Sequence, residues 1–309
     1  MVVVGVARWL SAIGVCLLGA AALTGCGAID STHPGLTTVV ASTDVWGSVA
    51  QAVAGGHVTV KSILTGVDDD PHSYQVSPSD AAAITDAALV VYNGGGYDSW
   101  VDQVLATHPA VKSVDAYSFL GAADPGGAGT ERNEHVFYNL TVAKLTAFAI
   151  ADRLAGIDPR NGAEYRSNAD EFGRSADAIA ASEHAIATKY KARGVIATEP
   201  VAGYLLAASG LVNRTPPAFT AANENETDPS PTDMASVLDL INHHQVAAVV
   251  INPQTSTAAI NSLRAAARRA GVPVTDMTET LPNGTDYLTW QRNTVNQLSA
   301  ALQTSGHLP

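Results

Sequence analysis

Short apolar runs alternate with helical patterns along most of the chain. The runs have the length of strands, and seven are clear: Thr37–Ala41, Val58–Leu64, Ala88–Tyr92, Val111–Val114, Val195–Thr198, Val246–Ile251 and Val272–Val274. The helical patterns between and after them cover Val45–Ala54, Ser79–Ala87, Ala202–Ser209, Thr232–Asn242, Thr257–Ala270 and Tyr287–Thr304. Strands that alternate with helices predict an α/β fold, in which parallel sheets are flanked by helices.

The stretch from Asp158 to Lys191 breaks this alternation. It is rich in Ala, Glu, Arg and Lys, it has no proline after Pro159, and its apolar residues recur at helical spacing. We therefore expect one long helix over Ala163–Tyr190, with Asp158-Pro159 as its start signal. The expected organisation is an N-terminal α/β lobe (36–157), a linking helix (158–191) and a C-terminal α/β lobe (192–309).

The first residues have the pattern of an export signal. Arg8 precedes an apolar run, Trp9–Leu23, and this run of about 15 residues is shorter than the roughly 20 that span a bilayer. It ends in Leu23-Thr24-Gly25-Cys26, which resembles the bacterial lipobox. We expect residues 1–25 to be a signal peptide, Cys26 to be lipidated, and the small and polar residues 26–35 to be a flexible tether. An ordinary signal peptide with an incidental Cys26 is the alternative.

Charge and cysteine content narrow the possible functions. The chain has 17 Lys and Arg against 29 Asp and Glu, a formal net charge of −12, so a nucleic-acid partner is not expected. The two cysteines are Cys16, inside the apolar run, and Cys26. If the signal is removed and Cys26 is lipidated, the mature protein has no thiol, and any metal site must consist of His and carboxylate ligands.

Two histidines occupy positions suited to metal binding, each near the end of a predicted strand, where α/β sheets bind ligands. His72 follows Pro71, which stiffens the chain, and it precedes Ser77-Pro78-Ser79-Asp80, a capped helix start. His135 follows a glycine-rich loop and precedes an aromatic pair. A turn histidine and a half-buried surface histidine are the respective alternatives.

Carboxylates follow two of the later predicted strands. Glu199 comes at the end of an apolar strand, where a free carboxylate is costly unless it is paired or bound to metal. After the last strand, either Glu279 or Asp276 could face inward. A helix-capping acid and a solvated loop acid are the alternatives for the two places.

Together these segments resemble the metal-binding solute-binding proteins of ABC importers for zinc and manganese. The resemblance covers about residues 36 to 304 and rests on five segments: Asp70-Pro71-His72-Ser73-Tyr74 with Ser77-Pro78-Ser79-Asp80, Glu134-His135-Val136-Phe137, Thr198-Glu199 with Gly203-Tyr204-Leu205, Asp228-Pro229-Ser230-Pro231, and Thr278-Glu279-Thr280-Leu281.

This resemblance implies a fold, a site and a partner. The family has two α/β lobes joined by one long rigid helix, with the metal in the cleft between them. It implies His72, His135, Glu199 and Glu279 as the metal ligands. The protein would be a monomer, anchored by its lipid to the extracytoplasmic face of the cell membrane, that delivers its cargo to an ABC permease.

The ligand set leaves the metal open. Two imidazoles and two carboxylates suit tetrahedral zinc, and the oxygen ligands favour manganese or, less strongly, ferrous iron. Many zinc members of the family have histidine at the third position and a histidine-rich loop near the second. Here Glu199 occupies the third position, and Gly121–Thr130 contains no histidine. We therefore expect Zn²⁺ or Mn²⁺ as the transported ligand.

A binding protein is expected rather than an enzyme, with three alternatives. A zinc-dependent hydrolase keeps one metal position open for water, whereas four protein ligands leave none. The sequence also lacks the His-Glu-x-x-His and Gly-x-Ser-x-Gly patterns. A binding protein for an organic solute would favour aromatic side chains in its cleft, and aromatic residues are only 6% of the chain. A surface adhesin stays open as a further alternative.

Overall fold

A computed structural model describes residues 37–66, 71–72, 74–123, 132–225, 227–255 and 257–305. The expected signal peptide, Cys26 and the tether lie outside these ranges, as do Asp70 and Ser73 of the first motif. Within the ranges, no helix is both long enough and apolar enough to cross a membrane.

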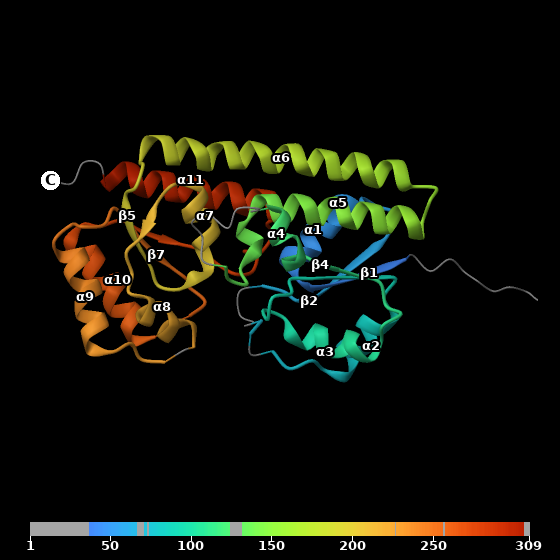
Figure 1. The fold of residues 1–309 in the computed structure, drawn as a ribbon, viewed down its shortest axis with the longest axis horizontal. Coiled ribbons are helices and arrows are strands. Elements are labelled where there is room, and N and C mark those ends of the chain that lie inside the picture. The colour runs from blue at the N-terminus through green and yellow to red at the C-terminus, as the bar shows by residue number, and fades with distance from the viewer. Residues whose placement is uncertain are drawn as a thin grey trace, which may run out of the picture. The chain divides into compact units, whose positions relative to one another are not determined.

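The first sheet contains four parallel strands in the order β2-β1-β3-β4. They are β1 (Thr38–Thr43), β2 (Thr59–Leu64), β3 (Leu89–Tyr92) and β4 (Ser113–Asp115). The helices of this lobe are α1 (Asp44–Ala54), α2 (Pro78–Asp86), α3 (Ser99–Thr107), α4 (Leu120–Ala123) and α5 (Leu140–Ile157), with short 3₁₀ turns η1 (Tyr117–Phe119) and η2 (Val136–Tyr138). They lie on both sides of the sheet (Figure 1).

Alternation along β1 explains why this sheet is covered on two faces. Val39 and Ala41 belong to an apolar cluster shared with α1 and α5, whereas Val40 packs with residues of α2 and α3. All three side chains are buried. Successive side chains of a strand point to opposite faces, so an unbroken apolar run fits a parallel sheet between two helical layers.

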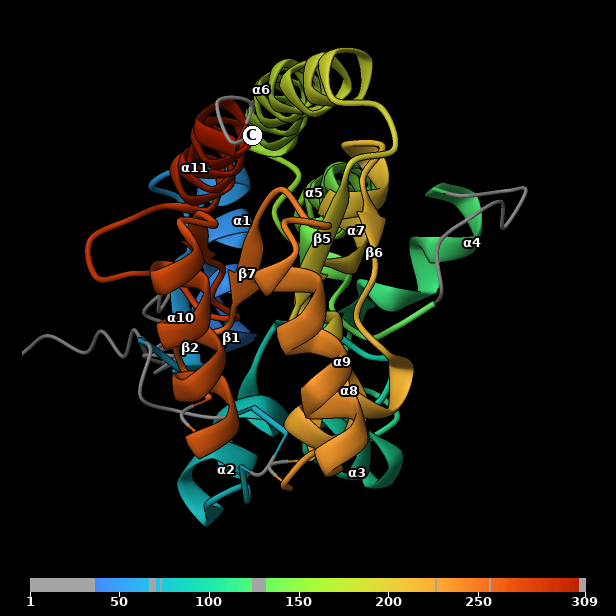
Figure 2. The same cartoon turned by 90° about the vertical axis from the view of Figure 1, so that its left-hand side faces the viewer.

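The second sheet repeats this arrangement with the order β6-β5-β7-β8, again fully parallel. Its strands are β5 (Gly194–Ala197), β6 (Val212–Asn213), β7 (Val249–Ile251) and β8 (Val274–Asp276). Its helices are η3 (Pro200–Ala202), α7 (Gly203–Ala208), α8 (Pro217–Glu224), α9 (Pro231–Asn242) and α10 (Ala258–Ala270). Ile196 and Ile251 pack with α8, α9 and α10, which are in the foreground of Figure 2, while Val195 and Val250 belong to the cluster that includes α7.

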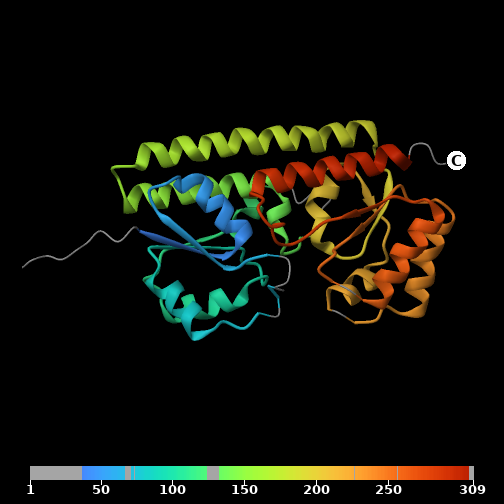
Figure 3. The same cartoon turned by 180° about the vertical axis from the view of Figure 1, so that it is seen from behind.

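Two long helices connect the lobes. Helix α6 (Gly162–Lys189) has 28 residues and contacts α1, α5, α7 and α11 (Tyr287–Ser305). In Figures 1 and 3, α6 runs along both lobes, and α11 lies beside it along the second lobe. One cluster of buried apolar residues extends from Val39 in the first sheet through α6 to Leu302 near the end of α11.

The two-lobed α/β fold and the long linking helix predicted from the sequence are confirmed. The region before that helix differs from the expectation, since α5 ends at Ile157 and α6 begins at Gly162. Asp158 lies in the turn between them, where its carboxylate accepts hydrogen bonds from Asn161 and Tyr165. Helix α5 was not predicted because its buried residues lie on most of its faces, which weakens the amphipathic pattern.

The first prediction tests the helix-cap assignment at the start of α10. Thr257 caps α10 by accepting a hydrogen bond from the backbone N–H of Ile260 at 3.2 Å. We expect Thr257→Ala to lower the free energy of unfolding by about 1 kcal/mol, because that N–H loses its partner. The measurement is urea unfolding, and Thr188→Ala on the exposed face of α6 is the control. Equal stability of the two variants would contradict the assignment.

Candidate metal centre

Three of the residues predicted as ligands converge where the two lobes meet. Oε2 of Glu279 lies 3.4 Å from Nε2 of His72 and 3.5 Å from Nε2 of His135. One ligand atom from each of the three residues lies within 4.8 Å of the others. The histidines come from the loops after β2 and before η2, and the glutamate follows β8. The first lobe thus supplies nitrogen donors and the second supplies oxygen.

His135 is held in a fixed orientation by its own loop. Its side chain is 0% exposed, and its Nδ1 lies 3.2 Å from the amide oxygen of Asn133, which also accepts the His135 backbone N–H. Because the amide oxygen accepts only, we assign the proton to Nδ1, so Nε2 is a free acceptor. Tyr97 and Phe137 pack edge-on against the imidazole. Nε2 has no hydrogen-bond partner among the described residues.

Glu279 is ionised and points its free oxygen at the histidines. Burial alone would raise its pKa, but the interactions of the carboxylate with His135 and His72, in the form in which each imidazole carries a proton at Nε2, outweigh burial and lower the pKa to about 2. Asn252 donates to Oε1 at 2.7 Å, and the side-chain oxygen of Gln254 accepts the Glu279 backbone N–H at 2.6 Å. The carboxylate is therefore positioned from one side and open to a cation on the other.

Glu199 lies next to this group, behind the same amide. It is buried after β5, and its Oε2 accepts a hydrogen bond from Nδ2 of Asn252 at 2.8 Å. Burial raises its pKa to about 7, partly offset by that hydrogen bond. Its Oε1 has no hydrogen-bond partner among the described residues. Asn252 therefore joins two carboxylates, Glu199 and Glu279, through one NH₂ group.

Asp276, the alternative to Glu279, lies elsewhere. It is exposed, and its Oδ1 accepts from Nη2 of Arg264 at 2.8 Å on the surface of the second lobe. Of the two acids after the last strand, Glu279 is therefore the one at the site.

Glu224 is a site residue that the sequence reasoning missed. It is the last residue of α8, and its Oε1 lies 3.6 Å from Nε2 of His135. Burial raises its pKa, and the charge of His135 partly offsets that effect. Both oxygens are buried without a hydrogen-bond partner among the described residues. In the sequence, Glu224 comes just before the loop of Asn225 to Pro231, which was recognised. It does not follow a predicted strand, and for that reason it was not considered as a site residue.

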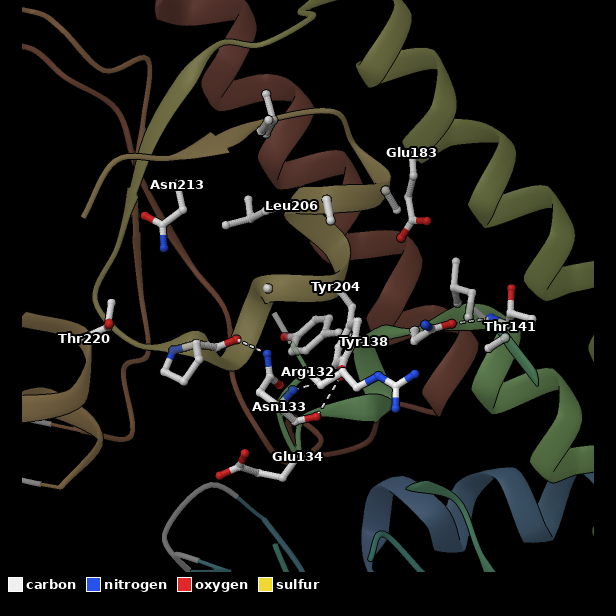
Figure 4. Close-up of a pocket in the computed structure, with 18 of the residues that line it drawn as sticks. Arg132, Asn133, Glu134, Tyr138, Thr141, Glu183, Tyr204, Leu206, Asn213 and Thr220 are labelled. Atoms are coloured by element: carbon white, nitrogen blue, oxygen red, sulfur yellow. Dashed lines mark hydrogen bonds between the residues drawn. The ribbon is translucent and has the colours of Figure 1, made fainter. Parts of the chain in front are cut away.

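A cavity of about 1130 Å³ adjoins the group. Its lining includes Glu134 and Glu224 near the histidines and Glu183 on α6. Figure 4 shows Glu183 projecting from α6 toward the pocket, and Tyr204 beside Asn133. The Tyr204 hydroxyl donates to the backbone oxygen of Asn133 at 2.8 Å, and it also lies 3.0 Å from that residue's N–H. This contact ties α7 to the loop that carries His135.

The arrangement suits a divalent cation. Unpaired polar atoms inside a protein are uncommon, because each costs free energy unless it has a partner. Several such atoms belong to the group or to residues beside it: Nε2 of His135, Oε1 of Glu199, Oε2 of Glu279 and both oxygens of Glu224. Imidazole nitrogen and carboxylate oxygen are the donors that zinc and manganese accept. A cation bound by Nε2 of His135 and Oε2 of Glu279, which lie 3.5 Å apart, would give both atoms a partner.

Comparison with known proteins shows the family to which the chain is similar. The sequence model of the family described as zinc-uptake complex component A periplasmic (ZnuA) matches residues 39–301. The manganese ABC transporter substrate-binding lipoprotein PsaA of Streptococcus pneumoniae is 26% identical over 181 residues, which are 55% of this chain and 58% of that protein. The chain thus matches little more than half the length of PsaA. The manganese-binding lipoprotein MntA of Bacillus subtilis is 24% identical over 262 residues, which are 82% of this chain and 84% of MntA.

The fold also has solved counterparts. The SBP FpvC of Pseudomonas aeruginosa, solved in complex with Ni²⁺, superposes with a TM-score of 0.69 at 19% identity. The match covers 89% of this chain and 99% of FpvC. At this identity the likeness shows the fold, which is the two-lobed arrangement described above.

The second prediction concerns Glu183, a buried acid that faces the cavity. Burial raises its pKa from 4.5 to about 8. Between these values the folded protein keeps a proton that the unfolded chain loses, so this group's contribution to stability is lost as pH rises from 4.5 to 8. We expect Glu183→Gln to stabilise the metal-free protein at pH 8 by more than about 1 kcal/mol and to have little effect at pH 4.

Denaturant unfolding at both pH values measures this effect. Glu171→Gln, which removes an exposed acid of the same helix, is the control and should change stability by less than about 0.5 kcal/mol. A Glu183→Gln variant that is equally stable or less stable than the parent at pH 8 would show that burial does not raise the pKa of Glu183.

Proposed function

Because the chain belongs to the zinc-uptake complex component A periplasmic family, we propose that it captures a divalent transition metal outside the cytoplasm and delivers it to an ABC permease. The convergence of His72, His135 and Glu279 carries this proposal, together with the buried atoms of His135 and Glu279 that have no hydrogen-bond partner among the described residues. The names of PsaA and MntA, which are a manganese ABC transporter lipoprotein and a manganese-binding lipoprotein, support the same role.

The proposed ligands are His72, His135, Glu199 and Glu279. His135 would bind through Nε2, since Nδ1 is engaged by Asn133. Glu279 would bind through Oε2, since Oε1 accepts from Asn252. Glu199 would complete the set through Oε1, which has no hydrogen-bond partner in the described part of the chain. Each proposed donor atom is therefore distinct from the atom that positions its side chain.

The cargo is Mn²⁺ or Zn²⁺. Manganese is supported by the oxygen-rich surroundings, because Glu224 adds a third carboxylate beside Glu199 and Glu279, and carboxylates suit manganese. Zinc is supported by the family description and by the two imidazoles, which zinc binds well.

An enzymatic role is not part of this proposal. A zinc hydrolase needs an open metal position, a bound water and a base to activate that water. The proposed ligand set closes the coordination shell with four protein side chains, and the matched family consists of transport proteins. A protein that exchanges its metal freely and shows no hydrolysis would agree with the transport role.

The third prediction tests the ligand set. We expect protein purified from defined medium to contain one transition-metal ion per chain. His135→Ala and Glu279→Gln should each weaken binding of that ion by at least about tenfold, because each removes a direct donor. Titration calorimetry with Mn²⁺ and Zn²⁺ in competition measures the loss and identifies the preferred cargo.

The control for this titration is His243→Ala. His243 is exposed at the end of α9 and pairs with Asp239 at 2.9 Å, so its loss should leave metal binding unchanged. A wild-type protein that binds neither metal would refute the proposed function. Equal effects of His135→Ala and His243→Ala would refute the ligand assignment.

The fourth prediction tests the anchor, which lies outside the described residues. We propose that Cys26 is lipidated and holds the protein on the extracytoplasmic face of the cell membrane. Cys26→Ser should release the protein from the membrane fraction, because the acyl chains supply the membrane affinity. Fractionation with immunoblotting measures the release, and Cys16→Ser is the control. Retention of both variants in the membrane fraction would contradict lipidation at Cys26.

A further inference from the structure

We propose that Glu134, Glu224 and His72 form a second, outer metal position, through which the cation passes to the inner group of His72, His135 and Glu279. This inference rests on the proposed function. One ligand atom from each residue of the outer group lies within 4.8 Å of the others, as is true of the inner group. His72 belongs to both groups, so the two positions are adjacent and share one ligand.

The surroundings of the Glu224 carboxylate favour a bound cation. Both of its oxygens are buried, and neither has a hydrogen-bond partner in the described ranges. A carboxylate in that state is costly unless a cation neutralises it. Its Oε1 lies 3.6 Å from Nε2 of His135, which is 0% exposed and equally unpartnered. Glu224 therefore brings the outer group into contact with the inner one.

The side chains of the outer and inner groups differ in their exposure to solvent. The inner side chains of His135 and Glu279 are 0% and 10% exposed, whereas Glu224 is 20% and His72 is 31% exposed. The cavity of about 1130 Å³ has Glu134 and Glu224 in its wall, while His135 and Glu279 are not among its lining residues. A cation that enters from the cavity therefore reaches the outer carboxylates before the inner donors.

Sharing of His72 gives the outer position its role. A neutral imidazole binds one cation through one nitrogen, so the outer and inner positions are alternatives rather than two sites filled together. The cation can exchange water for carboxylate oxygen at Glu134 and Glu224, keep His72 as a ligand, and then gain His135 and Glu279. The expected stoichiometry is one ion per chain.

The fifth prediction isolates the outer position with Mn²⁺ as the probe. In the full-length protein, the double variant His135→Ala/Glu279→Gln removes two of the inner donors and should still bind one Mn²⁺, more weakly than the parent. Adding Glu134→Gln should weaken this residual binding by a further factor of about ten, because Glu134 is one of the three donors of the outer position. Electron paramagnetic resonance of free and bound Mn²⁺ measures both affinities.

The control is Glu171→Gln in the same double variant, which removes an exposed acid of α6 and should leave the residual affinity unchanged. Circular dichroism and the melting temperature of each metal-free variant verify folding. Residual binding that is equal with Glu134→Gln and with Glu171→Gln overturns the outer position, as does a folded double variant that binds no Mn²⁺. A wild-type protein that binds no metal refutes the proposed function instead, so the two failures are distinguishable.

A kinetic measurement gives a second test that does not need the double variant. If the cation passes through the outer position, Glu134→Gln alone should slow Mn²⁺ association, followed by stopped-flow fluorescence of the tryptophans, by about threefold or more. Its effect on the dissociation constant should be smaller than that of Glu279→Gln. An unchanged association rate would overturn the role of Glu134.

Discussion

One apolar core runs without a break from the first sheet to the second, and the position of every candidate ligand depends on it. Helix α6 and helix α11 contribute side chains to this core along both lobes. Moving the lobes apart would expose that shared surface to water, which is unfavourable in proportion to its apolar area. The loops that carry His135 and Glu279 are thereby held at a fixed separation, close to what one ion requires. A wide opening between the lobes is not expected, and metal-dependent changes should be confined to loops at the site.

The site concentrates acidic groups that would destabilise an ordinary protein interior. Glu279 stays ionised because two imidazoles face it, and its pKa is about 2. The pKa of Glu199 is raised to about 7 because the side chain is buried, with a single amide as its hydrogen-bond donor at Oε2. Neighbouring carboxylates with such different protonation behaviour are typical of functional sites, where local stability is exchanged for ligand affinity. The common requirement of these groups is positive charge, which a divalent cation supplies.

Much of this arrangement could be predicted from the sequence, for physical reasons that also explain the omissions. The strands are buried on both faces and give unbroken apolar runs, and α6 has an exposed face that produces a regular helical pattern. His72 and Glu199 were recognisable because each is next to a proline, which marks the end of a regular element. Helix α5 was missed because a helix buried on most sides loses its polar stripe. Glu224 and Asn252 were missed because their roles arise only when α8 and the loop after β7 fold against the histidines.

If the proposed ligands hold the metal, Asn252 gives the two lobes unequal parts in its release. One Nδ2 group donates to both Glu199 and Glu279, at 2.8 and 2.7 Å. The same short loop supplies Gln254, which holds the backbone of Glu279. A small displacement of this loop would therefore break the hydrogen bonds that position both carboxylates. His135 is held separately, by Asn133 on the first lobe. Because the carboxylates carry the negative charge that attracts the cation, moving the second-lobe loop lowers affinity without disturbing the core. Release of the metal would then need only a movement of this loop, while the apolar core that aligns the ligands stays unchanged.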